Sequence, residues 1–324
     1  MPTGRGFQHI MGVKKETTLG TAVATDTKVC YISDTLDEQY QHIQNQALIG
    51  TGAPKKSIQS VKTVPGGFDT YWTYKLADPL LVCFFGTHTV VSGGDNYYKM
   101  DEEIDGDGLT VAIDRQVSVH QYSGFKLSQM TITGNPTDGV RLAFEGFGMG
   151  RSLAPTLNSA SVLAALTEPS QEMKFTDLTL RIDDLTGALS SADDIAVSAF
   201  SLTINRNLQQ DEVNSQTLLE ALENNFRVGT LTLNVPRYTA NTFLSWHSAH
   251  TTLQCELAFD NGTDPYKKIR LPQLKVVSVP VQAGGPGLLP MTITLSLHNN
   301  RDDANTQTNF THDEEIRIFE EDGS

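Results

Sequence analysis

Few residues of this sequence have the types and spacing that chemistry requires. Acids alternate over 101–108 as at the start of a calcium-binding loop, but Ala112 stands where such a loop needs a bidentate Glu. His247 and His250 are three residues apart, with no third metal ligand close by in the sequence. The three cysteines lack Cys-x-x-Cys spacing, and neither a Gly-x-Ser-x-Gly elbow nor a phosphate-binding loop occurs. We therefore predict no catalytic residue, no metal site and no cofactor, and we predict that the protein is not an enzyme.

Charge separates this chain from proteins that grip nucleic acid. The 324 residues carry a formal net charge of −14, and the segments 95–114 and 301–324 contribute −6 each. A protein that binds nucleic acid by neutralising its phosphates needs an excess of basic residues, so the acidic composition argues against this class. A surface that lets DNA pass without binding it is still compatible with the composition. The longest apolar runs, such as 80–85, are far shorter than the about 18 residues of a membrane span. Residues 1–16 lack the apolar region of a signal peptide, so we expect no membrane contact and a reducing cytosol as the place of synthesis.

The elements that would position any site are mostly β strands. Apolar and polar residues alternate with a period of two, as expected for half-buried antiparallel strands. The clearest runs are 140–144, 178–182, 200–204, 231–235, 253–259 and 289–297. Helical signals are few: Asp78 and Pro79 suit the N-cap and first position of a short helix over 78–85, and a similar start precedes 243–246. Residues 216–225 are predicted to form another turn or two of helix.

An internal repeat organises these strands. Segment 125–132 aligns without gaps with 269–276: both have apolar residues at positions 1, 3, 6 and 8, a base at position 2 and Gln at position 5. A regular strand would keep one parity, so we predict a bulge between positions 3 and 6. Each half also has two strands separated by a long polar connection, 34–60 or 208–225, and such connections are usually functional. The chain is therefore predicted to contain two copies of one β-rich domain.

The predicted domain boundaries follow from this repeat. They are an N-terminal arm over 1–30, a first β domain over 31–155, a connector over 156–170, a second β domain over 171–300 and an acidic C-terminal arm over 301–324.

Several segments are similar to those of one protein family. Residues 12–22, GVKKETTLGTA, resemble a "kE…lGTa" opening, and 31–36 precede the first long loop. Residues 64–70 resemble a glycine-marked strand, and 197–206 resemble a central strand. The family with these features is that of phage tail tube proteins, the major tail proteins of tailed bacteriophages. The likeness covers nearly the whole chain, which differs from single-domain members in carrying two copies.

The resemblance implies a fold, an assembly and a role. The fold is mainly β, with two tandem tail-tube-like β-sandwich or half-barrel domains, each with a short flanking helix. Single-domain members form hexameric rings, so a duplicated chain is expected to form homotrimer rings with pseudo-sixfold symmetry. The rings would stack into the tail tube of the virion, a conduit for DNA ejection. Expected partners are further copies of the chain and the tape measure, tail terminator and distal tail proteins. DNA would pass without specific binding, and assembly would occur in the host bacterial cytoplasm.

Candidate site residues follow from the loops, the arms and the acidic segments. In the resemblance, long loops and terminal arms hold one ring to the next, and the alternation at Ile316 and Ile318 predicts a short strand that adds to a neighbour's edge. The candidate ring-to-ring contacts are Phe7, Ile10, Tyr40, Ile43, Lys55, Lys56, Leu218, Leu219, Phe226, Ile316, Ile318 and Phe319. The candidate acidic lumen or rim residues are Asp101, Glu102, Glu103, Asp105 and Asp107, because an acidic wall would repel phosphate.

Two other functions are consistent with the same sequence. One is a different tube or connector component of a phage. The other is a two-domain β-sandwich module that binds carbohydrate or protein, with Tyr97, Tyr98 and Tyr238 stacking on sugars.

Overall fold

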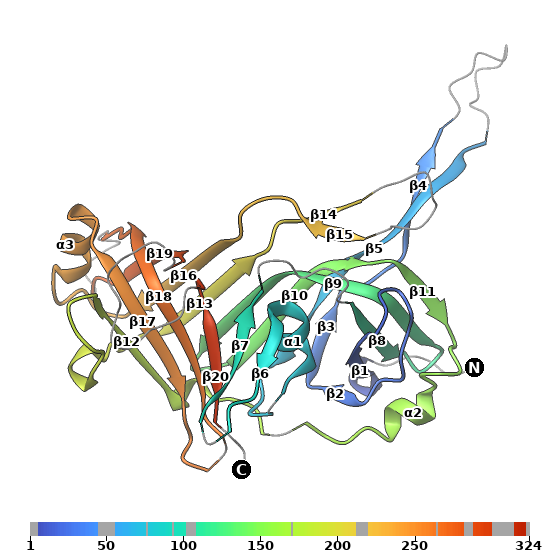
Figure 1. Ribbon diagram of the computed structural model, residues 1–324, viewed down its shortest axis with the longest axis horizontal. Coiled ribbons are helices and arrows are strands. Elements are labelled where there is room, and N and C mark those ends of the chain that lie inside the picture. The colour runs from blue at the N-terminus through green and yellow to red at the C-terminus, as the bar shows by residue number, and fades with distance from the viewer. Residues whose placement is uncertain are drawn as a thin grey trace.

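The computed structural model describes residues 6–44, 56–75, 77–92, 94–101, 108–169, 171–211, 220–263, 265–281, 288–299 and 314–321. Within them the chain folds mainly as antiparallel β strands with three short α helices, as the alternating runs predicted. Figure 1 shows the first half of the chain on the right and the second half on the left.

The elements of the first half are η1 (Gly6–Gln8), β1 (Ile10–Lys15), β2 (Thr27–Val29), β3 (Tyr31–Asp34), β4 (Gln39–Ile43), β5 (Ile58–Tyr71), α1 (Pro79–Phe85), β6 (Gly86–Thr89), β7 (Asn96–Met100), β8 (Leu109–Asp114), β9 (Val119–Asn135), β10 (Gly139–Gly148), β11 (Gly150–Leu153) and α2 (Ala160–Ala164). Those of the second half are η2 (Phe175–Asp177), β12 (Leu178–Asp184), η3 (Ser191–Asp193), β13 (Ala199–Asn205), β14 (Leu208–Gln210), β15 (Ala221–Glu223), β16 (Val228–Val235), α3 (Thr242–Ser248), β17 (Thr252–Phe259), β18 (Lys267–Ser278), β19 (Met291–His298) and β20 (Arg317–Glu320).

The same set of strand pairings occurs twice. In one layer, β3–β5–β10–β9 of the first half corresponds to β13–β16–β19–β18 of the second. In the other layer, β1–β8–β9–β11 corresponds to β12–β17–β18–β20. We call these sets the first and second repeat, in which α1 and α3 hold equivalent places. Since β9 and β18 pass from one layer to the other, each repeat is a partly closed sandwich.

One long sheet runs through both repeats. β9 pairs with β13, so that the order β3–β5–β10–β9–β13–β16–β19–β18 is continuous, and we call it the long sheet. One of its faces packs into the main core, a large cluster of buried side chains from both halves. Trp72 and Phe259 meet there edge to face, with ring centroids 5.6 Å apart. The repeats therefore share a core as well as a sheet.

Local details confirm part of the sequence reading. Both predicted bulges exist: β9 has an extra residue opposite Glu145 and Gly146, and β18 has one opposite the stretch from Leu253 to Cys255. Asp78 caps α1, because its side chain accepts a hydrogen bond of 2.9 Å from the Leu80 backbone N–H. The helix predicted over 216–225 is wrong for 221–223, which form β15 and pair with β14.

The C-terminal segment corrects a second prediction. β20 lies between β18 and β7 of its own chain, where both neighbours would otherwise present open edges. Ile316 and Ile318 are completely buried there, and Phe319 is half-buried against Tyr97. The two isoleucines therefore offer no surface to another ring, and residues 314–321 are part of the fold rather than a separate arm.

The bulge in β9 leaves little room at Gly146, the facing residue of β10. A Cβ atom added at Gly146 would lie 2.0 Å from the Lys126 carbonyl oxygen, so Gly146→Ala is expected to destabilise the subunit by about 1–3 kcal/mol. Gly187→Ala is the matched control, since nothing lies within 4 Å of a Cβ at that position. Denaturant unfolding of the two variants measures the difference, and equal stabilities would contradict the tight packing at the bulge.

Candidate assembly surfaces and conduit face

The face of the long sheet that points away from the core is polar and solvent-facing. Along residues 129–135 of β9, and along β13, β16 and β19, buried side chains alternate with half-buried or exposed ones. We call these residues the open face. They are Gln129, Thr131, Thr133, Asn135, Ala199, Ser201, Thr203, Asn205, Val228, Thr230, Thr232, Asn234, Thr292, Thr294, Ser296 and His298.

Hydroxyls and amides of the open face bond to one another across strands. The Oγ1 atoms of Thr131 and Thr203 are 3.2 Å apart across the junction of the two repeats. Thr292 Oγ1 donates to Asn234 Oδ1 at 2.9 Å. Such cross-strand pairs fix side-chain orientation while leaving hydrogen-bonding capacity for water.

Charge is missing from this face. About a quarter to a third of an ordinary protein surface is charged, yet no Asp, Glu, Lys or Arg belongs to the open face. Its one histidine, His298, has a pKa lowered by burial and by Lys275, which favours the neutral ring at pH 7. The other strands of the long sheet do carry charge on the same side: Asp69 on β5, Glu145 and Arg141 on β10, and Lys275 on β18. Their formal charges cancel.

The junction of the two repeats is a regular antiparallel pairing. Phe200 to Asn205 of β13 pair in register with Gly134 to Gln129 of β9, with Leu202 opposite Ile132. This junction completes the long sheet, and we call it the internal joint.

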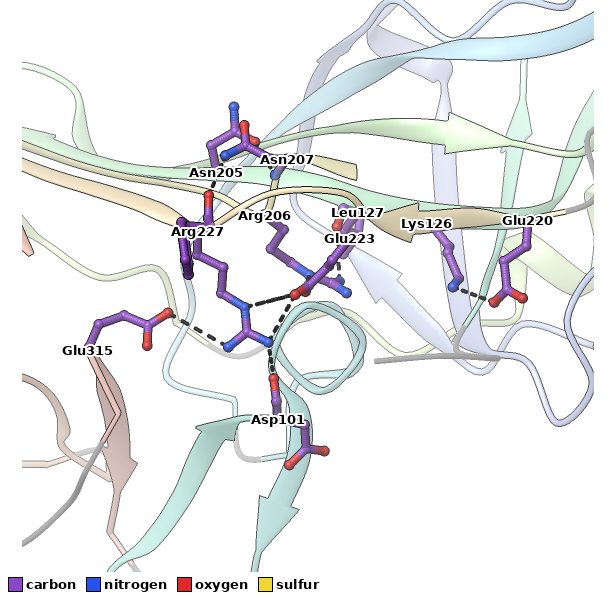
Figure 2. A network of polar contacts seen from close by, with 11 residues as sticks. Asp101, Lys126, Leu127, Asn205, Arg206, Asn207, Glu220, Glu223, Arg227 and Glu315 are labelled. Carbon is purple, nitrogen blue, oxygen red and sulfur yellow. Dashed lines mark hydrogen bonds and ion pairs between the residues drawn. The ribbon is translucent and has the colours of Figure 1, made fainter. Parts of the chain in front are cut away.

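Ion pairs reinforce the internal joint (Figure 2). Arg206, almost fully buried, donates to Glu223 Oε1 at 2.9 Å and to the Leu127 carbonyl at 3.2 Å. Lys126 Nζ of β9 lies 2.5 Å from Glu220 Oε1. These contacts join Lys126 and Leu127 of β9 to the second repeat. Lys126 reaches Glu220 of the long connection directly, and Leu127 is linked to Glu223 through Arg206. Lys126, the base at position 2 of the sequence repeat, thus has a structural role in the first copy.

A second arginine joins three other segments at the same place (Figure 2). Arg227 pairs with Glu223 at 3.2 Å and lies 3.8 Å from Glu315, which precedes β20. It also donates to the backbone carbonyl of Asp101, whose carboxylate accepts a 2.5 Å hydrogen bond from Thr87. Asp101 therefore lies at the end of β7, outside the long sheet. The other candidate acids, Glu102, Glu103, Asp105 and Asp107, lie outside the described residues.

A buried charged cluster fastens β20 to the first repeat. Glu320 is fully buried and accepts from Tyr98 Oη at 2.9 Å, pairs with His88 Nε2 at 2.7 Å and lies 3.4 Å from Lys267 Nζ. Burial lowers the pKa of Lys267, and Glu320 and Asp78 oppose that shift. Burial likewise raises the pKa of Asp78, and Lys267 opposes it. Each charge of the cluster is therefore held in place by the others.

Both ends of the long sheet have open edges. Among the described strands, β3 pairs with β5 alone. At the other end, β17 covers β18 as far as Lys275, and β19 lies on the opposite side of β18. On the side facing away from β19, residues 276–278 thus have no strand partner within the described ranges, and Val277 is 54% exposed.

The predicted ring-to-ring contacts fall into three groups. The exposed ones are Phe7, Tyr40, Ile43, Lys56 and Phe226, and Ile10 is half-buried. Tyr40 and Ile43 belong to the β4–β5 hairpin, which projects from the body in Figure 1. Lys55, Leu218 and Leu219 lie outside the described residues, and the C-terminal group is the buried one described above. Sequence reasoning missed the open face, although the Thr and Ser residues between the apolar positions of each strand were its signal.

No group of three or more His, Cys, Asp and Glu side chains is arranged to hold a metal ion in the described parts. No helix there has the length and apolar character to cross a membrane.

Comparison with known proteins identifies the family. No curated protein matches the chain. The family model described as phage tail tube protein matches residues 6–298, which include the long sheet, the internal joint and both open edges. Members of such a family self-assemble into a tube, associate with other tail proteins and belong to the virion tail. With most of its length matched, this chain belongs to the phage tail tube protein family and is a structural tail tube protein.

Proposed function

We propose that copies of this chain join edge to edge into rings that stack as the tail tube and conduct DNA during ejection. The observation that carries the proposal is the internal joint, which already links two equivalent repeats through their long sheets. The two open edges of the chain occupy the same places in their repeats as the two strands of that joint. A strand edge with unpaired backbone groups is a template for another strand, so repetition of the joint between copies is the natural continuation.

The registers define which residues would meet. Ile132 and Val276 are equivalent, because both hold position 8 of the sequence repeat. Ile132 pairs with Leu142 and Val276 pairs with Leu295, so Leu142 and Leu295 are equivalent as well. Leu142 also pairs with Thr70, which pairs with Tyr31, while Leu295 pairs with Leu231, which pairs with Leu202. Tyr31 is therefore equivalent to Leu202. In a repeated joint, Tyr31 of one copy lies opposite Val276 of the next.

Such a joint is head to tail, so closure gives a ring. Three copies supply six repeats, and we expect a homotrimer with pseudo-sixfold symmetry. The core face of the long sheet is covered by the second layer and the helices. These elements take up more space than the open face does, so they fit on the outside of the ring, where the circumference is larger. The open face then lines the lumen.

Stacking of rings involves the projecting segments. The β4–β5 hairpin presents Tyr40 and Ile43, and Phe7 and Phe226 are 81% and 88% exposed. Exposed aromatic and aliphatic residues on projecting loops are suited to burial against another ring. Phe319, the loop residues Lys55, Lys56, Leu218 and Leu219, and an acidic rim over 101–107 stay predictions. Tape measure, tail terminator and distal tail proteins would close the ends, and assembly would take place in the host cytoplasm.

Negative-stain electron microscopy of the concentrated protein, with the mass of the smallest ring measured alongside, tests the proposal. Stacked rings with a central hole and a mass of three chains are expected. A monomer that stays dispersed at high concentration would contradict the tube, and rings of six chains would contradict the pseudo-sixfold arrangement alone.

A further inference from the structure

We propose that the wall of this conduit is electrically neutral, and that DNA passes over a hydroxyl and amide surface rather than being repelled by acids. The proposal rests on the tube assembly above, because assembly places the open face in the lumen. It differs from the expectation that an acidic chain lines its lumen with acids.

The composition of the open face carries the inference. The chain has 38 acids and 24 bases, yet the open face contains none of them. On β5, β10 and β18, the outward side of the long sheet carries two acids and two bases, which are Asp69, Glu145, Arg141 and Lys275. Apolar residues are nearly missing as well: Ala199 and Val228 are the exceptions. A solvated sheet face normally tolerates Lys, Glu and Arg, so the joint lack of charge and of apolar surface points to a requirement of what moves past it.

DNA supplies such a requirement. Each Lys or Arg contact with phosphate releases counterions and adds affinity, which would hold a moving duplex. Each Asp or Glu raises the potential against which a polyanion enters a narrow channel. A wall of Thr, Ser and Asn binds water through hydroxyls and amides and does neither. The bonds between Thr131 and Thr203, and between Thr292 and Asn234, keep this wall regular across the internal joint and within the second repeat.

Charge near the wall is balanced locally. Arg141 on β10 pairs with Asp138 at 2.5 Å, and Lys275 Nζ donates to the His250 carbonyl at 2.7 Å. Arg141 lies on β10 together with the exposed Glu145, and Lys275 on β18, so these strands of the long sheet add charges of both signs to the same face.

The first test uses wild-type tubes and a short fluorescent DNA duplex. The Debye length is about 30 Å at 0.01 M salt and about 8 Å at 0.15 M, so charges on a wall act across a channel mainly at low salt. A neutral wall predicts that the fraction of duplex inside the tubes, normalised to an uncharged dextran of similar size, changes less than about twofold between these salts. Exclusion at 0.01 M that is relieved severalfold at 0.15 M would overturn the proposal.

Matched variants test the same face from both sides. Thr203→Asp with Thr232→Asp is expected to create the low-salt exclusion that the wild type lacks. Thr203→Lys with Thr232→Lys is expected to retain duplex at low salt and to lose about tenfold of that retention between 50 and 200 mM salt, for two phosphate contacts. DNA held inside should resist nuclease. Thr186→Lys, at an exposed turn after β12, is the control whose bound DNA is digested.

The outcomes separate this inference from the assembly on which it rests. Microscopy of the same samples shows whether tubes are present. Tubes that exclude duplex at low salt, or lysine variants whose DNA is digested as readily as that on Thr186→Lys tubes, overturn the neutral wall and leave the tube intact. A wild-type protein without tubes overturns both. The wild-type salt series decides the matter if the lysine variants do not assemble.

Discussion

Replacing Glu320 with glutamine is expected to destabilise the subunit by about 3–5 kcal/mol, the usual effect of removing one partner of a buried ion pair. Glu320 and Lys267 are both fully buried, and Glu320 is the larger of the two acidic influences that oppose the burial penalty on Lys267, the other being Asp78. The glutamine would also weaken the contacts to Tyr98 and His88 that hold β20 against the first repeat. Urea unfolding of the two proteins, followed by circular dichroism, measures the difference.

The neighbouring residue provides the control. Glu321 is exposed, and Glu321→Gln is expected to change stability by less than about 0.5 kcal/mol. Adding Lys267→Met to Glu320→Gln should recover part of the loss, because the methionine removes the unpaired buried charge. If Glu320→Gln unfolds at the same urea concentration as Glu321→Gln, the cluster does not fasten β20. If the double variant is less stable than Glu320→Gln alone, the remaining contacts of Lys267 matter more than its charge.

The position of this cluster explains why sequence reasoning placed the C-terminal segment wrongly. Alternation at Ile316 and Ile318 predicted the strand itself, since period-two patterning is a local signal. The partner of a strand is not a local property. The neighbours of β20 are β18, some fifty residues earlier in sequence, and β7, more than two hundred residues earlier, and Glu320 and Lys267 have no motif that announces a buried pair.

The repeat, in contrast, could be read from the sequence to the level of single bulges. Segment 125–132 aligns with 269–276, and β9 and β18 each carry an extra residue between positions 3 and 6 of that alignment. In the first repeat the extra residue faces β10, and in the second it faces β17. A bulge shifts the phase of the apolar–polar alternation along its own strand, so it can be recognised without knowing which strands are in contact. The Asp78–Pro79 start of α1 was predictable for the same reason, because capping is decided within one helical turn.

The open face lies between these two cases. Each of its residues occupies the polar phase of a strand that the sequence predicted, so the faces were known. Which strands would lie side by side was not, and the neutral surface emerges when β9, β13, β16 and β19 are placed together. Clustered acids are easily recognised in a sequence. Threonines that are far apart in the sequence form a continuous surface only when the strands are placed side by side in the fold.

Oxidation of a Val277→Cys variant is expected to produce a ladder of covalent oligomers that ends at the number of chains in a ring. In the repeated joint, Tyr31 lies opposite Val276, so the residue before it, native Cys30, is brought close to position 277 of the next copy. Val277 is exposed at the open edge, and directly opposed Cβ atoms in paired strands are about 4.5–5.5 Å apart. For a pseudo-sixfold ring of three chains, we expect three bands on a non-reducing gel, which are the monomer, the cross-linked dimer and the cross-linked trimer.

The chemistry of Cys30 gives the experiment its own signature. Burial and the nearby Glu172 raise the pKa of the Cys30 thiol to about 11, so its thiolate is scarce at neutral pH. Because the thiolate is the reactive form, cross-linking through Cys30 should accelerate steeply as the pH is raised from 8 towards 10. An ordinary exposed cysteine pair, with a thiol pKa near 8.5, would level off within that range.

Two controls make the ladder decisive. Cys30→Ser in the Val277→Cys background removes one end of the cross-link and should abolish every rung. Val91→Cys, at an exposed position on the turn between β6 and β7, should give no ladder under the same oxidation. Rings that form normally in the microscope while Val277→Cys and Ser278→Cys both fail to cross-link to Cys30 would show that copies meet through another edge. A covalent dimer that survives Cys30→Ser would show the same, because the cysteines at 277 would then be joining to each other, a symmetric contact that a head-to-tail ring does not allow.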